Sequence, residues 1–170
     1  MKEMHKFYIN GEWVNSLGSE TIEVINPSDE SIIGSIAAGT KEDIDVAVAA
    51  AKEAFKSFGF SSKEERISLL ENIILEYEKR SDELAQTISA EMGAPLWLSN
   101  VAQVTSGLSH FKDTLNVLKT FEFETTENEY IIRKEPIGVI GMITPWNWPM
   151  NQMCTKVASA IASGCTMVLK

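Results

Sequence analysis

Hydrophobic and polar residues alternate in short runs over the first 36 positions of the chain, which is the pattern of β-strands. The runs occupy residues 7–9, 13–14, 21–25 and 31–36. Asn10-Gly11 separates the first two runs, and Asn26-Pro27 opens the polar stretch before the last. Because Asn-Gly between apolar runs favours a two-residue turn, we expect a hairpin at Asn10-Gly11 and short strands on either side of the second break.

The hydrophobic period becomes helical between Thr40 and about residue 120. Thr40 and Ser62 are each followed three residues later by an acidic residue, which is the sequence of a capping box at a helix start. A third helix is expected at 82–92 because Gly93 follows it and a proline lies just beyond. A fourth is expected at 96–118.

The last 50 residues return to strand patterns, predicted at 121–125, 130–133 and 137–143. The run at 137–143 has almost no polar side chain, so it is typical of a strand covered on both faces in a parallel sheet. A helical pattern begins at Pro149, ends before Gly164 and is followed by a second apolar strand at 166–169. This strand-helix-strand unit predicts an α/β fold.

The segment PWNWP, Pro145 to Pro149, follows the carboxyl end of the first of these strands. In open α/β sheets, ligands bind beyond the carboxyl ends of the strands, so Asn147 stands where a ligand is expected. The same asparagine could instead cap the following helix, with Pro149 in its first turn. On local geometry alone, the cap is the preferred interpretation.

Composition and charge exclude several classes of protein. With 44% hydrophobic and 23% charged residues, and no apolar run near the roughly 18 residues that a membrane span needs, the chain is expected to be cytoplasmic, with no membrane partner. A net charge of −9 argues against nucleic acid as a partner. Cys154 and Cys165 fit no zinc or disulfide spacing, so we interpret both as buried structural thiols and expect no metal. His5 and His110 have no partner at a useful spacing and are interpreted as ordinary solvated or packed histidines.

Two long stretches carry a resemblance to a known family. EPIGVIGMITPWNWP, which starts at Glu135, and KVASAIASGCTMVLK, from Lys156 to Lys170, resemble the cofactor domain of NAD(P)-dependent aldehyde dehydrogenases. The resemblance continues upstream through FYINGEW at Phe7, through Asn26-Pro27 and through the helix at 40–55. It therefore covers essentially the whole chain.

The resemblance implies a fold and a division of the chain. The expected fold class is α/β, the N-terminal part of a Rossmann-like cofactor domain with part of an oligomerisation arm. Residues 1–117 would belong to the cofactor domain, 118–136 would form strands of the arm, and 137–170 would form the first strand-helix-strand of the Rossmann-like sheet. The family's catalytic domain would be absent from this chain, and the arm implies a homodimer or homotetramer.

The resemblance also implies an activity, which is oxidation of an aldehyde to a carboxylic acid with NAD or NADP through a cysteine thiohemiacetal and thioester. Asn147 would donate its amide hydrogen to the substrate oxyanion, with its backbone locked by the flanking tryptophans and prolines. Lys156 matches a lysine close to the active site, although a simple helical lysine is an equal interpretation. Residues that match the family's cofactor contacts are Ile143, Thr144, Pro145, Trp146, Asn147 and Lys170. The family does without a G-x-G-x-x-G fingerprint, which this chain also lacks.

The family's nucleophilic cysteine, general-base glutamate and glycine-rich loop all match positions beyond Lys170. The preferred interpretation is therefore the N-terminal part of a longer dehydrogenase. Two alternatives remain, a truncated non-catalytic fragment that binds dinucleotide or pairs with other subunits, and a different α/β nucleotide-binding module. Because two parallel strands cannot cover both of their faces, we expect these 170 residues alone to expose a large apolar patch and to be unstable.

Overall fold

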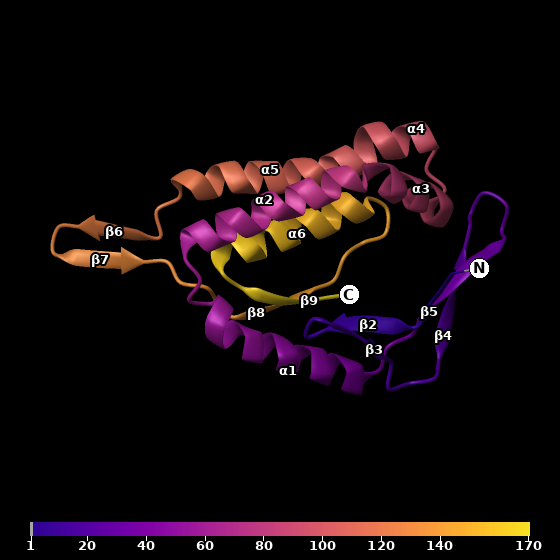
Figure 1. Ribbon diagram of the computed structural model, residues 1–170, viewed down its shortest axis with the longest axis horizontal. Coiled ribbons are helices and arrows are strands. Elements are labelled where there is room, and N and C mark those ends of the chain that lie inside the picture. The colour runs from indigo at the N-terminus through magenta and orange to yellow at the C-terminus, as the bar shows by residue number, and fades with distance from the viewer. Residues whose placement is uncertain (1) are drawn as a thin grey trace.

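The computed structural model describes residues 2–170, so Met1, where the first predicted region begins, lies outside the described residues. Its strands are β1 (Lys2–Met4), β2 (Lys6–Ile9), β3 (Glu12–Asn15), β4 (Thr21–Ile25), β5 (Ile32–Ala37), β6 (Glu124–Glu127), β7 (Tyr130–Arg133), β8 (Val139–Met142) and β9 (Thr166–Leu169). Its helices are α1 (Lys41–Phe58), α2 (Lys63–Lys79), α3 (Ser81–Met92), α4 (Leu96–Leu98), the π-helix η1 (Ser99–Val104), α5 (Thr105–Thr120) and α6 (Pro149–Ser163). The sheet of β1, β4 and β5 and the β6–β7 hairpin lie at opposite ends of a helical body (Figure 1).

The N-terminal strands form two separate sheets. β2 and β3 pair antiparallel across Asn10-Gly11, so the predicted hairpin is confirmed. The predicted strands at 21–25 and 31–36 are confirmed as β4 and β5, which pair antiparallel. β1 adds to the other edge of β5 in parallel. β1 was not predicted, because its three residues are too few to show an alternating pattern.

Local signals placed the helix ends correctly. Thr40 and Ser62 both form capping boxes, at the starts of α1 and α2. α3 and α6 end at Gly93 and Gly164, which have φ values of 76° and 79°. Glycine adopts this left-handed conformation without a steric penalty, so it ends a helix where another residue would be strained.

Asp43 in the first turn of α1 also anchors the segment that follows β3. Its carboxylate accepts hydrogen bonds from the Leu17 amide at 2.9 Å, the Ser16 hydroxyl at 2.8 Å and the Thr40 amide at 2.8 Å. These donors, the Leu17 amide first among them, hold the pKa of Asp43 below its ordinary value. The ionised carboxylate therefore stabilises the folded chain.

Replacing Asp43 by asparagine is expected to lower the melting temperature at pH 7, because an amide cannot accept from three donors at once. The pKa of Asp43 is lower in the folded than in the unfolded chain, so its carboxylate contributes its full stabilisation above about pH 4. This contribution is lost as the pH falls through the pKa of the folded state. The difference in melting temperature between wild type and Asp43→Asn should therefore narrow as the pH falls below about 4. Asp45→Asn, at an exposed position paired with Lys41, is the control and should show little effect at either pH.

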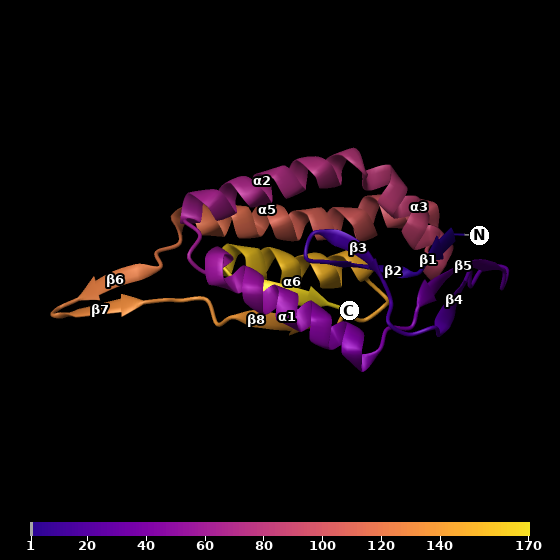
Figure 2. The same cartoon turned by 60° about the horizontal axis from the view of Figure 1, so that its bottom comes forward.

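The helical body is built from α2, α5 and α6, which lie side by side in both ribbon views (Figures 1 and 2). Leu70, Phe111 and Cys154 are among the most buried side chains of this core. Gly107 lets α5 approach α6 closely. A Cβ atom at this position would lie 2.5 Å from Tyr77 Oη, 2.9 Å from Met150 Cβ and 3.1 Å from Cys154 Sγ.

The single helix expected at 96–118 is interrupted, which corrects that prediction. A π-helical segment, η1, lies between α4 and α5. Tyr77 Oη donates a hydrogen bond of 2.8 Å to the Val104 carbonyl at the end of this segment. A π-turn changes which backbone groups pair within a helix. Contacts from other elements decide whether such a turn forms. The hydrophobic period of the sequence therefore does not reveal it.

β8 and β9 pair in parallel, as predicted, and they lie between two helices. Met142 of β8 and Met167 of β9 pack with Ala160 of α6, while the Thr166 hydroxyl donates to the Ala51 carbonyl of α1 at 2.8 Å. α1 covers part of the second face of the β8–β9 pair, although Leu169 of β9 is still 41% exposed. The expected instability of the 170 residues stays a prediction. Next to the ends of β8, Ile137 is 89% and Ile143 is 83% exposed.

The β6–β7 hairpin projects away from the helical body (Figures 1 and 2). β7 begins and ends as predicted, but the strand expected at 121–125 begins only at Glu124. Phe121 and Phe123 instead pack against each other with ring centroids 4.8 Å apart, and the Arg66 guanidinium lies 4.8 Å from the Phe123 ring centroid. These contacts anchor the chain to α2 before the ladder starts.

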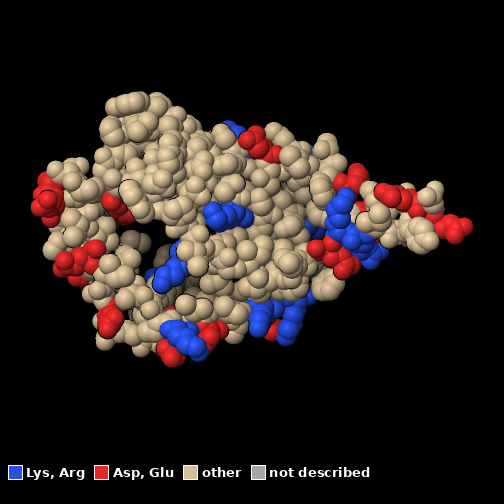
Figure 3. All heavy atoms as spheres, turned by 180° about the vertical axis from the view of Figure 1, so that it is seen from behind, with Lys and Arg blue, Asp and Glu red and all other residues tan. Residues whose placement is uncertain are grey.

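On the face seen in Figure 3, charged side chains gather along the lower edge and near the two ends, much of the upper part carries none, and acidic residues lie near the tip of the projecting hairpin. Arg133 and Glu124 form one such exposed pair across the hairpin at 2.8 Å. In the part of the chain from residue 2 to 170, no helix is both long and apolar enough to cross a membrane.

Candidate functional site

The carboxyl ends of β8 and β9 bring two of the predicted site residues together. The Lys170 amide donates to the Met142 carbonyl at 2.9 Å, and the Thr144 amide donates to the Lys170 carbonyl at 3.4 Å. Thr144 and Lys170 therefore lie beside each other at the same edge of the parallel pair, although 26 positions separate them in the sequence. This edge is where α/β sheets bind ligands.

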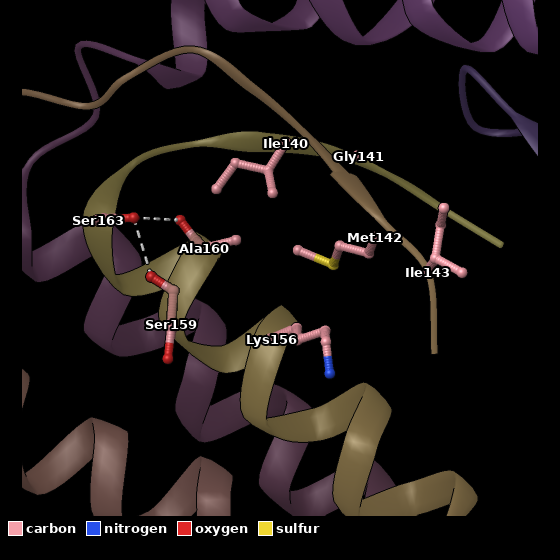
Figure 4. Close-up of a pocket in the computed structure, with 8 residues that line it drawn as sticks. All are labelled: Ile140, Gly141, Met142, Ile143, Lys156, Ser159, Ala160 and Ser163. Atoms are coloured by element: carbon pink, nitrogen blue, oxygen red, sulfur yellow. Dashed lines mark hydrogen bonds between the residues drawn. The ribbon is translucent and has the colours of Figure 1, made fainter. Parts of the chain in front are cut away.

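An open cavity of about 430 Å³ lies against this edge, between β8 and α6 (Figure 4). Its lining residues are Ile140, Gly141, Met142, Ile143, Lys156, Ser159, Ala160 and Ser163. Ile143 and Lys156, both predicted from the resemblance, thus border one cavity. The Lys156 ammonium donates to the Gln152 carbonyl at 3.1 Å and to Gln152 Oε1 at 3.2 Å, so both of these hydrogen bonds lie on its own helix.

Asn147 lies in an exposed bend between β8 and α6. Trp148 is the N-cap of α6, and no side chain makes a capping hydrogen bond there. The interpretation of Asn147 as a helix cap is therefore wrong. Since Pro149 occupies the first helical position, the cap falls on the residue directly before it, which leaves the asparagine one position outside the helix.

The tryptophan before Asn147 does not clamp it within this chain, contrary to expectation. Trp146 is 78% exposed, and Pro145 is exposed as well. The bend is instead reached from η1. Gln103 is only 2% exposed, and its Nε2 donates to the Asn147 carbonyl at 3.3 Å. Gln103 could not be predicted, because no motif marks it and 44 positions separate it from Asn147.

The two cysteines are buried, as expected. Cys154 is 0% and Cys165 is 2% exposed. Burial raises the pKa of the Cys154 thiol to about 12. Because a thiolate is the reactive form, Cys154 is poorly suited to act as a nucleophile near neutral pH. In residues 2–170 no group of three or more His, Cys, Asp or Glu side chains is placed to hold a metal ion.

The site therefore offers an asparagine amide in an exposed bend, a lysine at the adjacent strand end and a cavity with a second lysine. An uncharged amide can donate a hydrogen bond to a developing negative charge at any ordinary pH, because it does not titrate. A lysine ammonium at a strand end offers three donors to hydroxyl or phosphate oxygens. The arrangement is suited to binding a polar ligand along the strand ends and presenting an exposed amide to it.

The chain is similar in sequence to known proteins of one family. A sequence model described as "Aldehyde dehydrogenase family" matches residues 13–170. A 3-succinoylsemialdehyde-pyridine dehydrogenase of a Pseudomonas species is 46% identical over 171 residues, which cover all of this chain and 36% of the relative. The chain thus spans about a third of the length of the curated relatives it matches.

Solved structures resemble this chain in fold and are identical to it at a similar share of positions. An aldehyde dehydrogenase of Bartonella henselae superposes with a TM-score of 0.97 at 43% identity, covering 99% of this chain and 36% of that one. A mutant of aldehyde dehydrogenase C from Pseudomonas syringae, in complex with NAD+ and octanal, superposes with a TM-score of 0.96 at 43% identity, covering 97% of this chain and 34% of that one.

Proposed function

Because this chain belongs to the aldehyde dehydrogenase family, we propose that it is the N-terminal portion of an enzyme that oxidises an aldehyde to a carboxylic acid with NAD+ or NADP+. The observation that carries the proposal is the position of Asn147, whose side chain stands in an exposed bend beyond β8 and is not used as a helix cap. An amide in that position is free to meet a substrate.

The strand-end residues fit a dinucleotide. Lys170 is exposed at the end of β9, and backbone hydrogen bonds hold it beside Thr144, so its ammonium is available to a ligand at this strand end. We propose that Lys170 binds ribose hydroxyls and that Ile143, Thr144, Pro145, Trp146 and Asn147 border the cofactor. When bound, the nicotinamide supplies the acceptor for the hydride that leaves the substrate.

Asn147 has a separate role in this proposal. Attack of a cysteine thiolate on the aldehyde gives a thiohemiacetal whose oxygen carries negative charge as it forms. The Asn147 amide would donate a hydrogen bond to that oxygen. Because the charge is present in the transition state and absent from the free aldehyde, this hydrogen bond lowers the barrier more than it strengthens substrate binding.

Lys156 is kept as a supporting residue. It borders the same cavity as Ile143, which places a cation close to the strand end. Its two hydrogen bonds to Gln152 fit a lysine that stabilises its own helix equally well, so its role is secondary in the proposal.

The nucleophilic cysteine is proposed to lie in a part of the longer protein outside this chain, since Cys154 and Cys165 are buried. The thiohemiacetal would then lose its hydride to the nicotinamide, and water would hydrolyse the thioester to the acid.

The β6–β7 hairpin is proposed to be the arm through which subunits pair as a homodimer or homotetramer. All four residues of β7 are exposed, and Tyr130 and Ile131 are 73% and 64% exposed. Exposed apolar side chains on a projecting strand favour burial against another chain. Light scattering of the native protein measures the number of subunits directly.

The proposal is tested by the intact mass of the native protein together with NAD+- and NADP+-dependent oxidation of octanal by the same preparation. We expect activity and a subunit of about 52 kDa, if these 18.8 kDa make up 36% of it as they do in the relatives. A subunit of 18.8 kDa that is folded and inactive would overturn the proposal and favour the non-catalytic fragment.

A further inference from the structure

A buried amide side chain lies where the helical body meets the bend that carries Asn147. Gln103 is 2% exposed, and glutamine is rarely buried to this extent without a partner. Its Nε2 donates to the Asn147 carbonyl at 3.3 Å and contacts Met92 Sδ at 4.0 Å. The side chain therefore joins η1 to the end of α3 and to the bend.

Gln103 lies within the π-helical segment η1. π-turns are rare and often occur at functional sites. η1 is held by the hydrogen bond from Tyr77 Oη to the Val104 carbonyl, one residue after Gln103. Among the described residues, Gln103 Oε1 and Ser99 Oγ of this segment are buried without a hydrogen-bond partner. Such groups cost free energy, so a compensating role is expected.

We propose that Gln103 is a positioning residue that holds the backbone of Asn147 and thereby aims the Asn147 amide at the substrate oxygen. Its hydrogen bond fixes the carbonyl of the residue whose side chain must be aimed. The tryptophan before the bend cannot do this within the chain, because Trp146 is 78% exposed. The catalytic consequence rests on the proposed function, whereas the contact itself does not.

The first test is Gln103→Met in the full-length protein, since methionine keeps the length of the side chain and removes the donor. We expect kcat for octanal to fall about 10- to 100-fold, because small displacements of a catalytic group have effects of this size. KM should change less than about threefold, because the Asn147 bond acts in the transition state. A kcat within about twofold of wild type would overturn the catalytic part of the inference.

Gln103→Glu gives a readout that a purely structural role would not produce. An ionised carboxylate cannot donate to the Asn147 carbonyl, but a protonated one can. The two atoms contacted by the Gln103 amide, Met92 Sδ and the Asn147 oxygen, do not titrate. We therefore expect the activity of Gln103→Glu relative to wild type to rise as the pH falls through the raised pKa of a buried glutamate. A constant ratio across pH would contradict the inference.

Asn100→Asp is the matched control, because it makes the same amide-to-carboxylate change on the same segment. Asn100 is exposed, and its Nδ2 donates to the Leu96 carbonyl at 3.0 Å, away from the bend. Its relative activity should not depend on pH. The melting temperature of each variant shows whether it folds. If Gln103→Met does not fold, the activity of Gln103→Glu relative to wild type at low pH tests the inference instead.

Hydrogen exchange separates failure of this inference from failure of the proposed function. Amides of residues 144–152 should exchange faster in Gln103→Met than in wild type, whether or not the enzyme is active. An inactive wild type with faster exchange in the variant would overturn the dehydrogenase proposal and keep the contact. An active wild type with unchanged exchange and unchanged kcat would overturn the role of Gln103.

Discussion

Replacing Asn147 by aspartate is expected to lower kcat for aldehyde oxidation by about 100- to 1000-fold, which is the usual effect of losing one oxyanion donor. Aspartate has nearly the same shape, but its carboxylate accepts hydrogen bonds and repels a developing negative charge. Because Trp148 is the N-cap of α6, the substitution removes no capping bond, and the melting temperature should hardly change. Steady-state kinetics and a thermal melt of the full-length protein measure both quantities.

Asn151→Asp is the control for this experiment, since it makes the same change within α6, two residues after the helix begins. Its kcat should stay close to that of wild type. If Asn147→Asp kept full activity, Asn147 would not be the oxyanion donor. If it lowered stability and left kcat unchanged, its role would be structural despite the geometry of the helix start.

Replacing Gly107 by alanine is expected to destabilise the protein by about 1–3 kcal/mol, which is typical of overpacking a core. The new methyl group would lie 2.5 Å from Tyr77 Oη and 2.9 Å from Met150 Cβ, so two helices would have to move apart. The better helix propensity of alanine, about 1 kcal/mol, offsets only part of this cost. Urea unfolding of Gly107→Ala and of Ser109→Ala, at an exposed position on the same helix, measures the difference.

A double-mutant cycle that combines Gly107→Ala with Tyr77→Phe tests whether the new methyl group clashes with the Tyr77 hydroxyl. The single change removes the hydroxyl that donates to the Val104 carbonyl, so it should itself destabilise the protein. In the double variant the hydroxyl is no longer in the way of the new methyl group, and the total loss should be smaller than the sum of the two single losses. Strict additivity would mean that Tyr77 is not what makes glycine necessary at this position.

Local signals were enough to predict much of the fold. The Asn10-Gly11 hairpin and the two capping boxes depend on residues within three positions of each other, and the structure has all of them. The π-turn and the late start of β6 were not predicted, because they depend on contacts from elsewhere in the chain. Tyr77 holds the end of η1, and Arg66 packs on Phe123 ahead of β6.

The sheet edge that carries the candidate site also followed from a local pattern, whereas the roles of its residues stay predictions. The strand-helix-strand pattern predicted the edge at which Thr144 and Lys170 meet. Pro149 correctly indicated where α6 begins. The interpretation of Asn147 as its cap was nevertheless wrong, because a proline at the first helical position makes Trp148 the N-cap. Gln103 could not be predicted, because its partner is a backbone carbonyl in another element and its own neighbours in the sequence show no special pattern.

The packing of α1 against β9 also sets an order of events during synthesis. The Thr166 hydroxyl and the Ala51 carbonyl that it contacts are 115 positions apart. At translation rates of about 5–20 residues per second, roughly 6–23 s pass between the synthesis of α1 and that of the strand that packs against it. During that time its apolar stripe is open to chaperones and to other nascent chains. The sheet layer is therefore expected to form late and slowly, after the helices joined by short-range contacts.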